Sequence, residues 1–196
     1  MKPGALTRLV LGNMREWQRD TQKLVVALDG YSGAGKTSLA TDLTRHSDQI
    51  VVLHQDDFVL PARERKDALS NASDPLSVFE LNFHDDERIR NLVSDFRAGK
   101  YKPDRQALLV DGVFLFHPRG LNELWDKRIY LDAEEQVADQ RRQKREKKRW
   151  GYQYVEETRK DSYFRLLTLA LKRYRKEYQP ERMADLVVTG SIDNQP

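Results

Sequence analysis

The sequence of 196 residues contains no cysteine. This absence excludes disulfide scaffolds and metal centres held by thiolates, and it favours a reducing compartment. The four histidines lack the spacing of a zinc-binding motif. No apolar run approaches the roughly 18 residues of a membrane-spanning helix, and the beginning of the chain lacks the apolar core of a signal peptide. We therefore expect a cytoplasmic protein that does not bind membranes.

A large excess of charge of one sign is also absent. The chain has 34 Lys and Arg against 31 Asp and Glu, which gives a formal net charge of +3. So small a charge does not by itself favour nucleic acid, and any electrostatic argument depends on local clusters. No linker rich in Pro, Gly or Ser divides the chain. Its length fits one domain, which we expect to span residues 1–196.

Five short apolar runs are spaced along the chain, at residues 23–29, 50–54, 107–111, 128–132 and 185–189. Most are nearly continuous Val, Leu and Ile, which is typical of parallel strands buried on both faces. Stretches of helical periodicity lie between them, most clearly at residues 157–178. This alternation predicts an open α/β sheet with ligands at the carboxyl ends of its strands. Residues 61–81 lack clear periodicity, and we expect an irregular active-site loop there.

A phosphate-binding motif directly follows the first predicted strand. The segment GYSGAGKT, from Gly30 to Thr37, matches G-x-x-x-x-G-K-[ST] in full. Such a loop surrounds phosphate oxygens with backbone N–H groups, while Lys36 reaches the β- and γ-phosphates and the Thr37 hydroxyl binds Mg²⁺. A chance match is the alternative, but the strand before and the helix after favour binding of ATP with Mg²⁺. The predicted nucleotide-binding residues are Gly30, Tyr31, Ser32, Gly33, Ala34, Gly35, Lys36, Thr37 and Ser38.

Aspartates follow two more of the predicted strands. Asp56 and Asp57 come just after the second run, and Asp111 ends the third. A carboxylate at this edge of the sheet can bind Mg²⁺ or accept the proton of an attacking hydroxyl. We predict that Asp111 binds the metal with Thr37, that Asp56 is catalytic, and that Asp56 and Asp57 contact the substrate. The alternative for each is a turn or a helix cap, which also explains Asp85 at the start of a predicted helix.

Residues 140–149 contain seven Lys or Arg in ten positions. Most such runs are solvated helix faces. Two functional interpretations compete: a lid at about residues 139–160 whose arginines neutralise the transferred phosphoryl group, or a nucleic-acid patch. We favour the lid because the run follows the fourth strand, and the near-neutral total charge makes nucleic acid the weaker interpretation. Trp150 is then a hinge or packing residue.

Taken together, these motifs resemble the uridine kinase-like branch of the P-loop kinases, which includes uridine kinase, phosphoribulokinase, pantothenate kinase and nicotinamide riboside kinase. The segments that carry the resemblance are GYSGAGKTSLA, HQDDF, DDERI, LLVDGVFLF and ERMADLVV. They occur in the family's order over nearly the whole chain. The resemblance implies a three-layer α/β P-loop fold with a five-stranded parallel sheet in order 2-3-1-4-5 and a helical lid.

The resemblance also implies roles for individual carboxylates. Asp56 matches the residue that receives the hydroxyl proton, Asp85 one that holds a substrate hydroxyl, and Asp111 an acid near the metal. The chain also departs from the family. Asp111 stands where uridine kinases have Glu, and HQDDF is closer to nicotinamide riboside kinases.

Arg141, Arg142 and Arg145 match the lid of these kinases in general position, and we name Arg142, with Lys36, as catalytic. We expect an ATP- and Mg²⁺-dependent kinase that phosphorylates a hydroxyl of a small molecule, with a nucleoside as the first acceptor. Nicotinamide riboside, pantothenate or another metabolite is the alternative. From other classes, a nucleic-acid-binding ATPase or a kinase fold without catalysis stays open, whereas the lack of N-K-x-D disfavours a GTPase.

Overall fold

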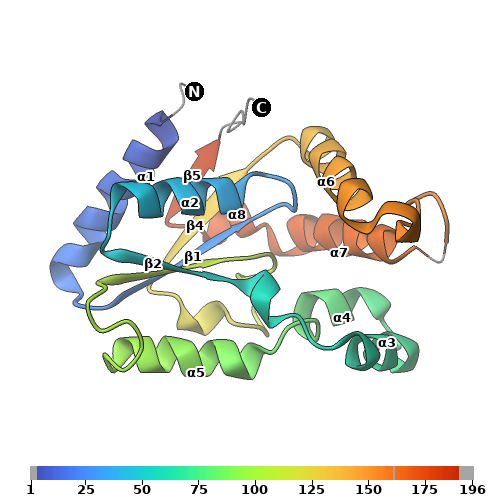
Figure 1. Ribbon diagram of the computed structural model, residues 1–196, viewed down its shortest axis with the longest axis horizontal. Helices are drawn as coiled ribbons and strands as arrows, with labels where there is room; N and C mark the ends of the chain where they lie inside the picture. Colours follow the sequence, from blue (N-terminus) through green and yellow to red (C-terminus); the bar gives the residue numbers. More distant parts are fainter. Residues whose placement is uncertain (1–3, 161, 190–196) are drawn as a thin grey trace.

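A sheet of five parallel strands forms the centre of the computed structural model, which describes residues 4–160 and 162–189 (Figure 1). The strands are β1 (Leu24–Gly30), β2 (Ile50–His54), β3 (Ala107–Asp111), β4 (Lys127–Asp132) and β5 (Leu186–Thr189). Their order is β2-β3-β1-β4-β5, and every pair is parallel. The predicted sheet order and the predicted strand positions are therefore confirmed.

Helices cover both faces of this sheet, as Figure 1 shows. They are α1 (Ala5–Trp17), α2 (Lys36–His46), α3 (Ala62–Asn71), α4 (Pro75–Leu81), α5 (Asp86–Arg97), α6 (Glu135–Trp150), α7 (Tyr163–Tyr178) and α8 (Pro180–Met183). Within the described ranges, none of them is long and apolar enough to cross a membrane. The three-layer α/β class is confirmed.

The alternation of side chains along β1 divides the core into two parts. Val26 and Leu28 point into a cluster with residues of α1 and α2, whereas Val25 and Ala27 point into a second cluster with residues of α4, α5 and α7. All four side chains are fully buried. A strand covered on both faces needs no polar side chains along its length, which explains its nearly continuous apolar sequence.

Two predictions about helices are wrong. Residues 61–81 form α3 and α4 rather than an irregular loop. Asp74 caps α4 by accepting a hydrogen bond from the Leu76 amide at 3.1 Å, and Pro75 stands at the first helical position, a strong start signal. Helix α7 begins at Tyr163 rather than at residue 157, because the Ser162 hydroxyl accepts from the Arg165 amide and ends the preceding turns.

Candidate active site

The phosphate motif forms the turn between β1 and α2. Gly33 has a φ of +92°, and a Cβ atom there would lie 2.2 Å from the Ala138 carbonyl oxygen of α6. Only glycine fits this position, because the backbone is left-handed and the neighbouring helix lies against it. Helix α2 starts at Lys36, so its amide groups point to the same place as the loop. The loop and the helix start together suit a phosphate anion.

The Lys36 side chain lies across the base of this loop and is only 7% exposed. Its Nζ donates hydrogen bonds to the carbonyl oxygens of Gly30 at 2.8 Å and of Tyr31 at 3.1 Å. Burial lowers the pKa of Lys36, and nearby carboxylates oppose that change. These carboxylates are Asp111, Asp29 and Asp56, while Arg145 of α6 lowers the pKa further. Two of the predicted site residues, Asp56 and Asp111, therefore lie within electrostatic reach of Lys36.

Thr37 and Asp111 meet at the end of β3. The Thr37 hydroxyl donates to Asp111 Oδ2 at 2.8 Å, and His54 Nδ1 lies 3.1 Å from the same oxygen. The hydrogen bond to Asp111 raises the pKa of His54. Hydroxyl and carboxylate oxygens are the ligands that Mg²⁺ prefers, so this pair fits the expected ion. His54 was not among the predicted site residues, although it ends β2 directly opposite Asp111 in the strand register.

Gln55 joins the turn that carries Asp56 to the strand end that carries Asp111. Its Oε1 accepts a hydrogen bond from the Val113 amide at 2.9 Å. A Cβ atom on Gly112 would lie 2.3 Å from the same oxygen. The glycine after Asp111 therefore leaves the space that the Gln55 side chain occupies. This contact fixes the turn after β2 relative to the end of β3, and the sequence analysis did not identify it.

The aspartates that follow β2 are exposed in a 3₁₀ turn at Gln55–Phe58. Asp56 raises the pKa of Lys36, and Asp57 raises the pKa of His54, although neither is the largest cause. Asp85 lies beside this turn, since its amide donates to the Phe58 carbonyl at 2.8 Å. Its carboxylate also caps α5 by accepting from the Arg88 amide at 3.0 Å. The structure thus brings Asp85 close to the turn and gives it a capping role as well.

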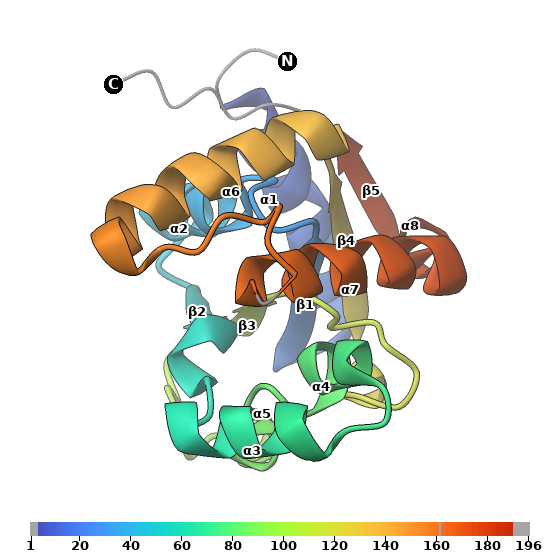
Figure 2. The same cartoon turned by 90° about the vertical axis from the view of Figure 1, so that its right-hand side faces the viewer.

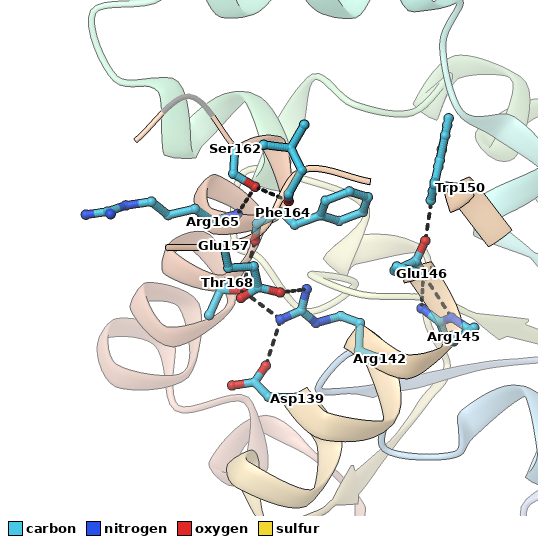
Figure 3. A network of polar contacts seen from close by, with 11 residues as sticks. Asp139, Arg142, Arg145, Glu146, Trp150, Glu157, Ser162, Phe164, Arg165 and Thr168 are labelled. Carbon is cyan, nitrogen blue, oxygen red and sulfur yellow. Dashed lines mark hydrogen bonds and ion pairs between the residues drawn. The ribbon is translucent and has the colours of Figure 1, made fainter. Parts of the chain in front are cut away.

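Arg142 is not where a catalytic lid arginine was expected. Its side chain is 1% exposed and lies between α6 and α7, as Figure 3 shows. It pairs with Asp139 at 2.9 Å and with Glu157 at 2.8 Å, and it donates to the Thr168 hydroxyl at 2.7 Å. Two carboxylates neutralise the guanidinium, so the surroundings of Arg142 favour a structural role over a phosphate contact.

Arg145 lies one turn further along α6 and is the arginine of the predicted lid that lowers the pKa of Lys36. Its side chain is 56% exposed and pairs with Glu146 at 2.8 Å. The Trp150 indole donates to the other oxygen of Glu146 at 3.0 Å, and its ring packs edge-on against Phe164. Trp150 is therefore a packing residue at the end of α6. Elsewhere in the basic run, Lys147 pairs with Glu156, so several of these cations already have acidic partners.

A buried carboxylate supports the loop from behind. Asp29 Oδ1 accepts from the Gly30 amide at 2.6 Å, and its Oδ2 accepts from the Tyr174 hydroxyl of α7 at 2.7 Å. Burial raises the pKa of Asp29 to about 6, while the Tyr174 hydrogen bond and Lys36 lower it. The contact links the start of the phosphate loop to α7. Asp29 was predicted only as the end of a strand, because its partner Tyr174 lies far along the chain.

No family model matches the chain. It is 27% identical over 199 residues to a uridine kinase from Leuconostoc citreum (strain KM20), covering 88% of this chain and 94% of the relative. It is 26% identical over 137 residues to nicotinamide riboside kinase 2 from Mus musculus, covering 63% of this chain and 68% of the relative. Among solved structures, a possible uridine kinase from Bacillus stearothermophilus matches with a TM-score of 0.57 and 17% identity, covering 91% and 98% of the two chains.

Proposed function

We propose that this chain, which resembles the uridine kinase-like P-loop kinases, transfers the γ-phosphate of ATP to a hydroxyl of a small molecule. The observation that carries the proposal is the meeting of a complete phosphate loop with Thr37, Asp111 and Asp56 at one edge of the sheet. The names of its relatives suggest the acceptor, and a nucleoside or another riboside is our first candidate. Pantothenate or another small metabolite is the alternative.

The nucleotide half of the site would act mainly through position and charge. Phosphoryl transfer passes through a loose transition state, so a kinase works by holding the reactants in line and by neutralising charge. The loop amides would hold the phosphates, and Lys36 would balance the charge that moves to the leaving oxygen. Thr37 and Asp111 would hold Mg²⁺, which neutralises phosphate oxygens when bound.

The acceptor half would depend on the aspartates of the turn after β2. Asp56 would orient the attacking hydroxyl and take its proton late, because a carboxylate is a weak base. Asp57 and Asp85 would hold other polar groups of the acceptor. On the lid, Arg145 would approach the transferred group, whereas Arg142 would position the helix. Arg145 would have to leave Glu146 to do so.

Replacement of Lys36 tests the proposal. We expect Lys36→Ala to lower turnover by about 10²-fold or more, because a charged donor aimed at the leaving phosphate is lost. The measurement is ADP release with MgATP and a panel of nucleosides, nicotinamide riboside, pantothenate and glycerate. Lys100→Ala, at an exposed lysine in the turn after α5, is the control and should keep the wild-type rate. Full activity of Lys36→Ala, or no acceptor-dependent ADP release by the wild type, would refute the kinase assignment.

A further inference from the structure

A cavity of about 320 Å³ lies between α3 and the first turn of α7. It is lined by Ala62, Arg65, Lys66, Leu69, Ser70 and Tyr163. Figure 2 shows α3 on the same side of the molecule as the start of α7 and the end of α6. The cavity is separate from the phosphate loop, and the nucleotide half of the proposed mechanism does not use it.

The charged side chains that line this cavity are of one sign. Arg65 and Lys66 line it, and none of the other lining residues is acidic. Among the described residues, neither cation forms an ion pair with a carboxylate. Arg63, on the same helix but outside the cavity, does approach a carboxylate, that of Asp67 at 4.0 Å. Two adjacent cations without acidic partners at the wall of a cavity favour an anionic ligand.

Arg65 is held in place before any ligand arrives. Its Nε donates to the Leu60 carbonyl at 2.9 Å, and its guanidinium lies 4.9 Å from the centre of the Phe83 ring. The Nε contact uses one of the five guanidinium N–H donors. Burial lowers the pKa of the neighbouring His84 to about 4, and Arg65 adds to this effect. His84 is therefore neutral at pH 7, and the cations of the cavity wall are Arg65 and Lys66.

Tyr163 connects the cavity to the carboxylates of the site. Burial raises the pKa of its hydroxyl; Arg65 opposes the rise, and Asp56 adds to it. Tyr163 thus lies within electrostatic reach of a cavity cation and of the proposed catalytic carboxylate. The chain segments agree with this position. The Tyr163 ring packs 5.6 Å from that of Phe83, and the next residue, His84, forms an antiparallel bridge with Val59 just after the Asp56 turn. An acceptor with its hydroxyl at Asp56 would therefore have the cavity beside it.

We propose that the acceptor carries an anionic group, a carboxylate or a phosphate, and that Arg65 and Lys66 bind this group while the acceptor hydroxyl lies at Asp56. The inference rests on the proposed function and narrows its substrate class. Among ribosides, the proposed anion site selects those whose nucleobase carries an anionic group over those whose nucleobase is neutral. Among smaller alcohols, it selects hydroxy acids and alcohol phosphates over uncharged polyols.

Matched acceptor pairs test this proposal. Orotidine differs from uridine by one carboxylate, and glycerate and glycerol 3-phosphate differ from glycerol by a carboxylate and a phosphate. We would measure kcat and KM with MgATP, and the binding of each compound by calorimetry in the presence of a non-hydrolysable ATP analogue. We expect the anionic member of at least one pair to bind about tenfold or more tightly than its neutral partner. The pair that responds distinguishes carboxylate from phosphate.

Variants on α3 provide the control. Lys66→Gln and Arg65→Gln should raise the KM or Kd of the anionic member about tenfold, while KM for ATP and binding of the neutral member change less than about twofold. Arg63→Gln removes the same charge outside the cavity and should leave all these values unchanged. Lys66 is exposed, so its substitution tests the site even if Arg65→Gln fails to fold.

The binding data keep this inference separate from the kinase assignment. Equal or weaker binding of the anionic members, or a loss shared by Arg63→Gln, would overturn the anion site and leave the kinase proposal standing. Tight, Lys66-dependent binding without any phosphorylation would support the anion site and refute the kinase proposal.

Discussion

Asp56 and Asp111 follow neighbouring strands at the same edge of the sheet, yet their surroundings differ. Asp111 is buried and accepts a hydrogen bond from the Thr37 hydroxyl, whereas Asp56 is exposed in the turn after β2. We expect Asp56→Asn to lower kcat by about 10²–10⁴-fold, because the proton acceptor is lost while the shape is kept. Affinity for ATP should not change. The measurements are kcat with the best acceptor and nucleotide affinity by calorimetry.

Asp111→Asn should behave differently. An amide is a weaker ligand than a carboxylate for a hard cation, so the concentration of Mg²⁺ that gives the half-maximal rate should rise. A Mg²⁺ titration of the rate measures this effect, with Asp56→Asn as the comparison. If Asp56→Asn shifted the titration and Asp111→Asn did not, the two assignments would have to be exchanged.

The contacts of single residues could be predicted only in part. The meeting of Thr37 with Asp111 follows from the phosphate motif and from the parallel strand order. The role of Gln55 could not be predicted, because it depends on a close approach to Gly112 that no local pattern encodes. The burial of Arg142 could not be predicted either, because a run of basic residues indicates a solvated helix face unless the carboxylates that pair with it are known.

At the scale of elements, the contact between the phosphate loop and α6 is testable through Gly33. We expect Gly33→Ala to destabilise the protein by about 1–3 kcal/mol, because a Cβ atom there is strained and meets the Ala138 carbonyl. ATP affinity should fall as well. Gly12→Ala is the control: Gly12 lies exposed within α1 with no atom near its Cβ position, and the change should stabilise by up to about 1 kcal/mol. Thermal unfolding and nucleotide binding measure both effects.

The Arg142 side chain joins α6 to the segment before α7 through its ion pair with Glu157, and to α7 through its hydrogen bond to Thr168. Removing one partner of a buried ion pair leaves the opposite charge without compensation. We therefore expect Arg142→Met to lower the free energy of unfolding by about 3–5 kcal/mol. Urea denaturation checks this value, with Lys148→Met on the exposed face of α6 as the control within about 0.5 kcal/mol. A loss no larger than that of the control would show that the contact does not stabilise the fold.

The helices and strands were predicted most accurately where their apolar pattern in the sequence is strongest. Continuous apolar runs located the strands because a parallel strand buried on both faces has no polar positions. Helix α3 was missed because it buries no side chain completely, which removes the periodicity that identifies a helix. Helix α4 does bury Val78 and Phe79, but its seven residues are too few to show that periodicity. The start signal of α4, Asp74 followed by Pro75, is present in the sequence.

For the whole molecule, stability should depend on pH through two opposing sets of groups. The pKa values of Asp29 and Asp86 rise from 3.8 to about 6, so these carboxyls lower the free energy of unfolding as pH rises through that interval. The pKa values of His84 and His117 fall from 6.5 to about 4, so these histidines raise it between pH 4 and 6.5. These two sets of groups therefore oppose each other between about pH 4 and 6.

Two variants separate the opposing contributions. His117→Gln removes a group that raises the free energy of unfolding as pH rises. The slope of that free energy against pH should therefore be more negative in this variant than in the wild type from pH 4 to 6.5. Asp86→Asn removes a group that lowers the free energy of unfolding as pH rises, so the slope of that free energy against pH should become more positive. Urea denaturation at a series of pH values measures both slopes. Slopes that change in the same direction would contradict the assignment of these groups.

The long excursion of the chain between β2 and β3 separates two tasks in one fold. Residues 55–106 leave one strand, form α3, α4 and α5, and return to the strand beside it. The proposed acceptor contacts belong to this excursion and to the start of α7, whereas the nucleotide contacts belong to the turn between β1 and α2. Under the proposed function, a change confined to this excursion would alter the choice of alcohol while the contacts with the phosphate donor stay the same.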